Sequence, residues 1–458
     1  MLKKEVNMLS GPIMPGLIAI TMPVLVMNVL QSLFNIIDMT MLKMFIPDSD
    51  VAVGAVGVCG MLITLVSCLV TGVATGANVV IAKCIGQGKQ DRVDKAVGTA
   101  VVFSLLGGLL LALIGIFCAE TFLRWMNCPD TLLAPATLYF QLYFVGAPIL
   151  MLYTFCAAIL RSTGDTKRTM VYSLTGGIVK VIATYVFVAL FGLTVDGVAY
   201  ATIVSWVISA ALAYVALAKN DGMVKIKRAY LGLHMRELRE MVSIGIPTGL
   251  QAALYSVANV IITATVNGFG DAAATGVSIA NNFDGLLYQI SIAPAVAVLP
   301  YVSQNIGAGN VKRATQSVWH GVLITVLFGA TFGMLSAIFS AELSSLMSSD
   351  PTVIAYSQQK MIIISSTYFI CGINEIMSAA LRGMGKPIVP TVSALIFMCG
   401  LRFVWVYLIF PLYENLTFLY VVWPVGWTLS IITLLCFFFP RIKKLRARFA
   451  DREAVPLA

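Results

Sequence analysis

A few ionisable side chains lie inside long apolar stretches of this sequence, and they are its candidates for chemistry. Asp38 lies fifteen residues after Pro23 in the first stretch, and Lys180 lies in a later one. The second half adds Asp284, Glu375 and Arg402. A charge at mid-membrane costs roughly 2.5–3.5 kcal/mol on insertion scales, so charges that persist there are functional candidates. The chemistry that such carboxylates offer is reversible binding of H⁺ or another cation.

The elements that must position these charges are membrane-spanning helices. Of the 458 residues, 59% are hydrophobic and only 11% are charged. A soluble domain carries roughly 25% charged residues, so a water-soluble globular protein is excluded. Apolar stretches of about 20 residues recur along the whole chain, and each can cross a hydrocarbon core of about 30 Å as a helix. Stretches of this length also exclude a β-barrel, whose strands are short and alternate in polarity.

We therefore predict an all-α membrane protein with twelve transmembrane helices. The predicted spans are 13–45, 52–82, 96–118, 133–160, 169–191, 197–218, 240–266, 272–304, 315–340, 354–381, 388–411 and 417–440. An even number of spans puts both termini on one side of the membrane. Of the 30 Lys and Arg residues, 25 fall on that side, which predicts that both termini are cytoplasmic.

The sequence also contains an internal repeat. The segment 85–88, Ile-Gly-Gln-Gly, is matched by Ile-Gly-Ala-Gly at 306–309. The segment 161–164, Arg-Ser-Thr-Gly, is matched by Arg-Gly-Met-Gly at 382–385, and the offset between the two copies is the same in both cases. Six spans in each half make the repeats parallel, as in secondary transporters whose substrate path lies between two halves.

The repeat and the longest polar break define the expected domains. We predict an N-lobe at 1–218, a cytoplasmic linker at 219–239, a C-lobe at 240–440 and a basic cytoplasmic tail at 441–458. The Lys and Arg residues of the linker are expected to set the topology and to contact lipid headgroups.

Other function classes lack their motifs in this sequence. The two histidines, His234 and His320, lie near cytoplasmic loops, and no HExxH, GxSxG or paired-aspartate motif accompanies them, so we do not expect an enzyme. No phosphate-binding loop indicates a nucleotide-driven pump. The net charge of +9 is dispersed over short polar breaks, which does not indicate a nucleic-acid partner. A passive channel stays open as an alternative.

In combination, the motifs resemble those of multidrug and toxic compound extrusion (MATE) transporters. Pro23–Asp38, which reads PVLVMNVLQSLFNIID, is similar to the opening helix of that family. The other motifs that carry the resemblance are 82–88, 160–166, 303–309 and 381–385. The resemblance covers nearly the whole chain. It is closest to the bacterial DinF-like branch, because Tyr255 stands where the NorM-like branch has a glutamate.

The resemblance implies two six-helix bundles in a V, in the bacterial inner membrane. It implies an antiporter that exports amphiphilic cationic organic compounds by alternating access, driven by H⁺ or Na⁺, without a resident cofactor or metal. The expected partners are the small organic substrate and membrane lipids, and the expected state is a monomer. A flippase for lipid-linked sugars or lipids from the same superfamily is the first alternative, which Lys180 and Arg402 keep open.

The resemblance also implies that Asp38 is the cation-linked aspartate and Pro23 the hinge of the first helix. Relatives with a described N-lobe cation site place Asn and Asp where this chain has Lys180 and Thr184, while Thr202 keeps the family's threonine. Hard cations need several oxygen ligands, so H⁺ is favoured over Na⁺. We hypothesise that Lys180 pairs with Asp38 until protonation breaks the pair, the alternative being a permanent ion pair or a lysine at the interface. The predicted coupling set is Asn35, Asp38, Lys180, Thr184 and Thr202.

A second set of residues could line a substrate cavity. The candidates are Gln31, Gln251, Tyr255, Asn259, Asn282, Asp284, Glu375 and Arg402. Hydrogen bonding between helices is the alternative role for the uncharged members. We expect Arg402 to pair with Glu375 or Asp284, since arginine is the usual partner of a buried carboxylate. Alternatively, one of the two acids meets a cationic substrate.

Overall fold

The computed structural model describes residues 6–45, 49–126, 128–413 and 415–453. Within these ranges the regular structure is helical and contains no strand. Eleven helices are long and apolar enough to cross a membrane, and a bent helix pair adds a twelfth span when the pair is counted as one. The prediction of an all-α membrane protein with about twelve spans is therefore confirmed.

The bent pair takes the place of the single span expected at 133–160. It consists of α4 (Asp130–Val145) and α5 (Ala147–Ser162), which meet at 47°. Pro148 stands in the first turn of α5, where its missing amide hydrogen removes a donor that a continuous helix would use. The bend also brings Pro148 against α3 (Gln90–Trp125), so closely that a Cβ on Gly108 would lie 2.4 Å from the Pro148 Cα.

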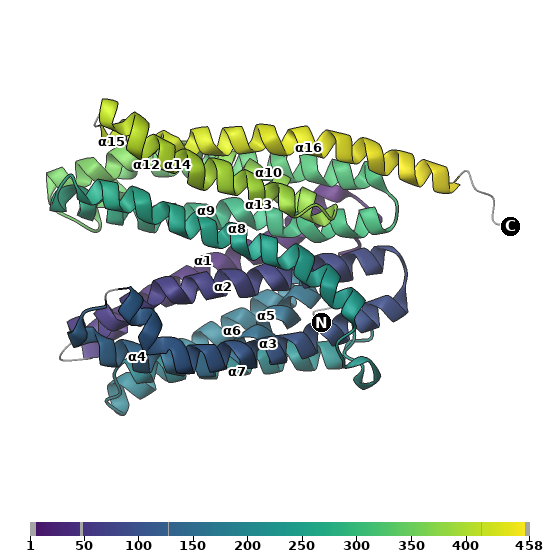
Figure 1. The fold of residues 1–458 in the computed structure, drawn as a ribbon, viewed down its shortest axis with the longest axis horizontal. Coiled ribbons are helices and arrows are strands. Elements are labelled where there is room, and N and C mark those ends of the chain that lie inside the picture. The colour runs from purple at the N-terminus through teal and green to yellow at the C-terminus, as the bar shows by residue number, and fades with distance from the viewer. Residues whose placement is uncertain (1–5, 46–48, 127, 414, 454–458) are drawn as a thin grey trace. The chain divides into compact units, whose positions relative to one another are not determined.

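The described chain forms two compact units, of which the first is Val26–Gly245. Within this unit α3 packs on α4 and α5, and α7 (Val195–Ala218) packs on α5 and α6 (Figure 1). Its further elements are α2 (Ser49–Gly86), α6 (Thr166–Thr184), the π-helical η1 (Tyr185–Leu190), the 3₁₀ turn η2 (Arg228–Tyr230), the end of α1 (Ile13–Phe45) and the start of α8 (Met235–Asn267).

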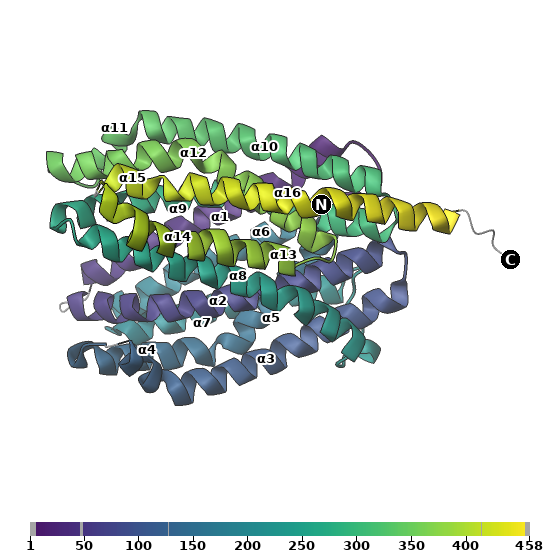
Figure 2. The same cartoon turned by 45° about the horizontal axis from the view of Figure 1, so that its top comes forward.

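The second unit comprises Val6–Leu25 and the chain from Ile246 onward. Its centre is α12 (Pro351–Gly383), which packs along α9 (Asp271–Gly307), α10 (Val311–Ile338) and α16 (Val422–Glu453), as Figure 2 shows. The remaining elements are α11 (Ser340–Ser345), α13 (Ile388–Ala394), η3 (Leu395–Gly400), α14 (Leu401–Val404), η4 (Trp405–Ile409), η5 (Phe410–Leu412) and α15 (Leu416–Tyr420).

The start of the described chain is fastened within the second unit by Arg313 at the beginning of α10. Its guanidinium donates to the carbonyl oxygens of Met8 at 2.9 Å, Ser10 at 2.8 Å and Gly11 at 2.8 Å. Asn305 donates a further bond of 3.1 Å to the Met8 carbonyl. The residues just before α1 are thereby held by α9 and α10.

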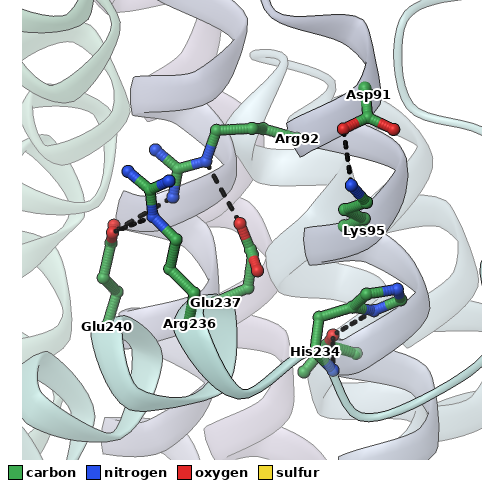
Figure 3. A network of polar contacts seen from close by, with 8 residues as sticks. Asp91, Arg92, Lys95, His234, Arg236, Glu237 and Glu240 are labelled. Carbon is green, nitrogen blue, oxygen red and sulfur yellow. Dashed lines mark hydrogen bonds and ion pairs between the residues drawn. The ribbon is translucent and has the colours of Figure 1, made fainter.

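The start of α8 is fastened within the first unit by Arg92 on α3. Figure 3 shows the Arg92 guanidinium between the carboxylates of Glu237 and Glu240, with an N···O distance of 3.1 Å to each. Lys227, from the predicted linker, pairs with Asp94 at 2.6 Å. Part of the linker's charge is thus used for ion pairs with α3, in addition to any role at lipid headgroups.

The repeated motifs turn out to be helix stops of one kind. Gly88, Gly164, Gly309 and Gly385 all have positive φ angles, between 66° and 84°. In each case the amide of the next residue bonds to the carbonyl five positions back, for example Lys386 to Leu381 at 2.9 Å. This is the Schellman arrangement, in which glycine takes the left-handed conformation without a steric penalty. The constant offset of the repeat therefore marks two equivalent helix ends in each half.

Close packing of α8 on α2 depends on a missing side chain at Gly76. A Cβ there would lie 2.1 Å from the Met241 carbonyl oxygen, whereas a Cβ on Gly285 meets no atom within 4 Å. We expect Gly76→Ala to destabilise the protein by about 1–3 kcal/mol, because the backbone of α8 must shift. The control Gly285→Ala should be neutral or slightly stabilising. Thermal unfolding of the purified variants in detergent measures both, and equal midpoints would contradict the packing argument.

Candidate functional site

The predicted coupling residues of the first unit are only partly described. The side chains of Asn35 and Asp38 lie outside the described residues, so the hypothesis of an Asp38–Lys180 pair stays a prediction. Lys180 is half-buried on α6, and Thr184 is fully buried at the end of the same helix. Thr202 is buried on α7, where its hydroxyl donates to the Val198 carbonyl at 2.9 Å.

Two other predicted residues of α1 have ordinary helical surroundings. Pro23 lies inside α1, at a point where the helix continues without a break. Gln31 donates from its Nε2 to the Ser173 hydroxyl on α6 at 2.8 Å. The Gln31 amide is therefore used for a bond between helices, which is the alternative role considered for the polar residues.

The second unit contains a buried polar chain that links α8 to α12. Arg382 donates to the Gln251 side-chain oxygen at 2.9 Å, and the Gln251 amide donates to the Tyr255 hydroxyl at 3.1 Å. The Tyr255 hydroxyl in turn donates to Glu375 at 3.4 Å and accepts from Asn374 at 3.3 Å. Tyr255, which marks the DinF-like branch in the sequence, thus stands between an amide and a carboxylate.

This chain continues to the neighbouring helices. The Asn374 side-chain oxygen accepts from the Ser430 hydroxyl of α16 at 2.7 Å, and Ser430 is bonded to Ser393 of α13 at 2.8 Å. Four helices therefore share one hydrogen-bonded network. Because most of these groups are buried and Tyr255 and Arg382 are half-buried, loss of one member leaves its neighbours without a partner.

Asp284 on α9 has a partner that sequence reasoning missed. The Lys360 ammonium of α12 lies 2.9 Å from its Oδ2 and also donates to the Asn281 side-chain oxygen. The Asp284 Oδ1 is enclosed and has no hydrogen-bond partner among the described residues. Lys360 lies in the predicted span 354–381. A basic residue in an apolar stretch was the one feature of the sequence that could have indicated a buried ion pair here.

Arg402 does not make the predicted ion pair. Its guanidinium donates to the Asn259 side-chain oxygen on α8 at 2.6 Å and lies over the Trp423 ring, 4.9 Å from the centroid. Within the described part of the chain neither Asp284 nor Glu375 lies within salt-bridge distance of it. The expectation of a pair with one of these acids was wrong, because Lys360 occupies Asp284 and Tyr255 bonds to Glu375.

The last cavity candidate, Asn282, is exposed. Its side chain donates to the Ser278 carbonyl of the preceding turn of α9 at 3.0 Å. Asn281, its neighbour, is the residue that contacts the buried ion pair instead.

Lys180 and Arg402 both lie on or next to helices that contain π-helical segments. Arg402 lies in the four-residue segment α14 between the π-helical segments η3 and η4, and η1 follows the helix that carries Lys180. Under the offset of the internal repeat, η1 corresponds to 406–411 and overlaps η4. Single-turn π segments are rare and occur frequently at functional sites.

Known proteins share these features of sequence and fold. The sequence model of the MatE family matches residues 23–186 and 247–408, most of the chain. The protein belongs to the MATE family. The two matched segments begin in α1 and α8, so each half of this MATE protein is recognised by itself.

Relatives of this MATE protein include transporters that are named for different roles. The probable multidrug resistance protein YoeA of Bacillus subtilis (strain 168) is 25% identical over 83% of this chain and 83% of its own. A FAD transporter of Shewanella oneidensis is 23% identical over 84% of this chain and 86% of its own. A solved MOP superfamily transporter from Pyrococcus furiosus has the same fold, with a TM-score of 0.89 and 19% identity over 97% of this chain and 99% of that one.

The buried Asp284–Lys360 pair gives a testable stability effect. We expect Lys360→Met to lower the free energy of unfolding by about 3–5 kcal/mol, because it leaves a carboxylate enclosed without its counter-charge. The double variant Lys360→Met/Asp284→Asn should recover most of the loss. Lys312→Met, which removes an exposed charge of α10, is the control. Chemical unfolding in detergent compares the four proteins, and an unaffected Lys360→Met protein would refute the role of the pair.

Proposed function

We propose that this MATE protein is a secondary active antiporter that exports organic compounds, amphiphilic cations among them, in exchange for H⁺. Family membership supports export, and the Asp284–Lys360 pair is the observation that favours H⁺ over Na⁺. A Na⁺ site requires several oxygen ligands around the ion. Here a lysine ammonium occupies the position beside the carboxylate that such an ion would need.

The same pair supports a coupling step. H⁺ binds to the Asp284 carboxylate, whose Oδ1 has no partner in the described structure, and Lys360 then loses its counter-charge. A buried amine without a counter-charge is unstable, so protonation favours the conformation in which Lys360 finds another partner or water. In the first half, protonation of Asp38 would break its proposed pair with Lys180 in the same way. Release of the proton restores the pair and completes the cycle.

The range of substrates is supported by the relatives. One relative is a probable multidrug resistance protein, and another is named a FAD transporter. FAD carries phosphates and aromatic rings, so transport in this family is not confined to cations. We therefore keep amphiphilic cations as the expected main class without excluding compounds that also carry an anionic group.

The proposed setting is the bacterial inner membrane, with a monomer whose termini are both cytoplasmic. The excess of Lys and Arg on the terminal side supports this orientation. The proposed division into an N-lobe, a linker, a C-lobe and a basic tail follows from the internal repeat. No cofactor is needed, because the ion gradient supplies the driving force.

A flippase for lipid-linked sugars or lipids is the second candidate. It is favoured by one observation, namely that Lys360 and Arg402 bring two cationic groups to the same ring of Trp423. Such groups suit a pyrophosphate, which an exporter of simple cations would not require. A passive channel is the third candidate, and it differs from both because it carries out no uphill transport.

Uphill transport in proteoliposomes tests the proposal. With an acidic interior, wild-type protein should accumulate ethidium, an amphiphilic cation, against its own gradient as H⁺ leaves. Asp38→Asn, Lys180→Ala and Asp284→Asn should reduce this uptake towards background, since each removes a partner in a titrating pair. Glu342→Gln, which neutralises an exposed carboxylate, is the control.

Three outcomes would contradict the proposal. Equilibration of ethidium without accumulation indicates a channel. Uptake driven by a Na⁺ gradient at equal pH indicates Na⁺ coupling. Full pH-driven uptake by both Asp38→Asn and Lys180→Ala would show that the proposed Asp38–Lys180 pair does not act as a switch.

A further inference from the structure

The interior of the second unit carries one positive charge more than its local ion pairs use. Arg402 and Lys360 both lie over the Trp423 ring, at 4.9 Å and 6.0 Å from its centroid. Lys360 is neutralised by Asp284 at 2.9 Å. The hydrogen-bond partner of Arg402 among the described residues is Asn259, an uncharged amide. Around this ring there are therefore two cationic side chains, and the one carboxylate close by pairs with Lys360.

The guanidinium of Arg402 also has unused hydrogen-bonding capacity. Arginine has five N–H donors in a planar fork, and one nitrogen is used for the bond to Asn259. The side chain is only 4% exposed, yet none of its nitrogens is among the enclosed atoms that lack a partner. Arg382 differs, because its Nε is enclosed without a partner. The remaining N–H groups of Arg402 are therefore not fully enclosed in the way that the Arg382 Nε is.

The surroundings hold this fork in a defined orientation. Asn259 fixes one nitrogen from α8, and the Trp423 ring of α16 supports the flat face of the guanidinium. Trp423 is itself half-buried, and the ring of Tyr420 lies 6.3 Å from it. An arginine oriented in this way offers two parallel N–H donors, which match a carboxylate or a phosphate. The adjacent aromatic rings would contact the apolar part of the same molecule.

The backbone supplies a separate indication of function. Arg402 lies in a short α-helical segment between two π-helical segments, so the helix departs from regular α-helical geometry on both sides of this residue. In a membrane, an irregular helix is tolerated where its freed backbone groups are satisfied by the protein, and it commonly lies at a binding site. The position of the charge and the shape of the helix therefore indicate the same place.

We propose that Arg402, Asn259 and Trp423 form a subsite for the anionic group, carboxylate or phosphate, of an aromatic substrate. The inference rests on the proposed export function, because it names a group that the exported compound presents. Arg402 donates to two oxygens of the anion, Asn259 keeps the guanidinium in plane, and Trp423 contacts the aromatic part.

Binding to the purified full-length protein, without any ion gradient, tests the subsite. The probes are 1-naphthoate and its uncharged analogue 1-naphthamide, titrated by calorimetry in detergent. Wild-type protein should bind 1-naphthoate at least about tenfold more tightly, as expected for one charge-assisted interaction. Arg402→Gln should abolish this preference while it leaves the binding of 1-naphthamide unchanged. Lys386→Gln, which removes an exposed charge from the same unit, should keep the preference.

Two further variants keep the test decisive if Arg402→Gln does not fold. Arg402→Lys retains the charge without the planar fork and should keep only part of the preference. Trp423→Phe should weaken both probes, since it reduces the aromatic surface. 1-Naphthyl phosphate distinguishes the two anionic groups, and tighter binding than 1-naphthoate would assign the subsite to phosphates.

The outcomes separate this inference from the proposed function. Equal affinity of wild-type protein for 1-naphthoate and 1-naphthamide overturns the subsite, as does a preference that survives in folded Arg402→Gln. If the preference is present but ethidium uptake is not driven by the proton gradient, the subsite stands and the coupling proposal fails. If uptake is proton-driven and the preference for 1-naphthoate is absent, the coupling proposal stands and the subsite fails.

Discussion

Inside hydrocarbon, a charged side chain finds no water and must be compensated by the protein itself. The second unit meets this constraint in two ways. Asp284 and Lys360 neutralise each other directly, whereas Glu375 is held through Tyr255 in a network that reaches Arg382. Arg402 stands apart, with an amide and an aromatic ring as its neighbours. Incomplete compensation is costly, which explains why we regard this residue as functional rather than structural.

The ends of the helices obey a related constraint, since carbonyls and amides at a helix end lack partners within the helix. Arg313 collects three carbonyls ahead of α1, and the motif glycines close the ends of four helices with bonds to the preceding turn. Arg92 holds the start of α8 through two carboxylates. The first helix of each half is therefore fixed at its beginning by arginine, although the two arginines use different acceptors.

The sequence predicted what depends on local pattern and missed what depends on neighbours. Hydropathy located the spans, and the constant offset between the repeated motifs located the equivalent helix ends. The break between α4 and α5 could have been found from Gly146 and Pro148. The partner of Asp284 could not, because Lys360 lies on a different helix and several basic residues were equally eligible. Arg402 was correctly singled out as a buried charge, but its neighbours Asn259 and Trp423 follow only from the packing of α8 and α16 on its helix.

The π-helical segments around Arg402 have a mechanical consequence. Each contains one residue more than an α-helical turn needs, and the position of this extra residue can shift from one turn of the helix to the next. When it passes a residue, that residue turns about the helix axis by about 100°, the angle of one α-helical step. Both ends of the span can remain in place while this happens. Such a shift would turn the four residues of α14, and the Arg402 guanidinium with them, about the axis of the helix.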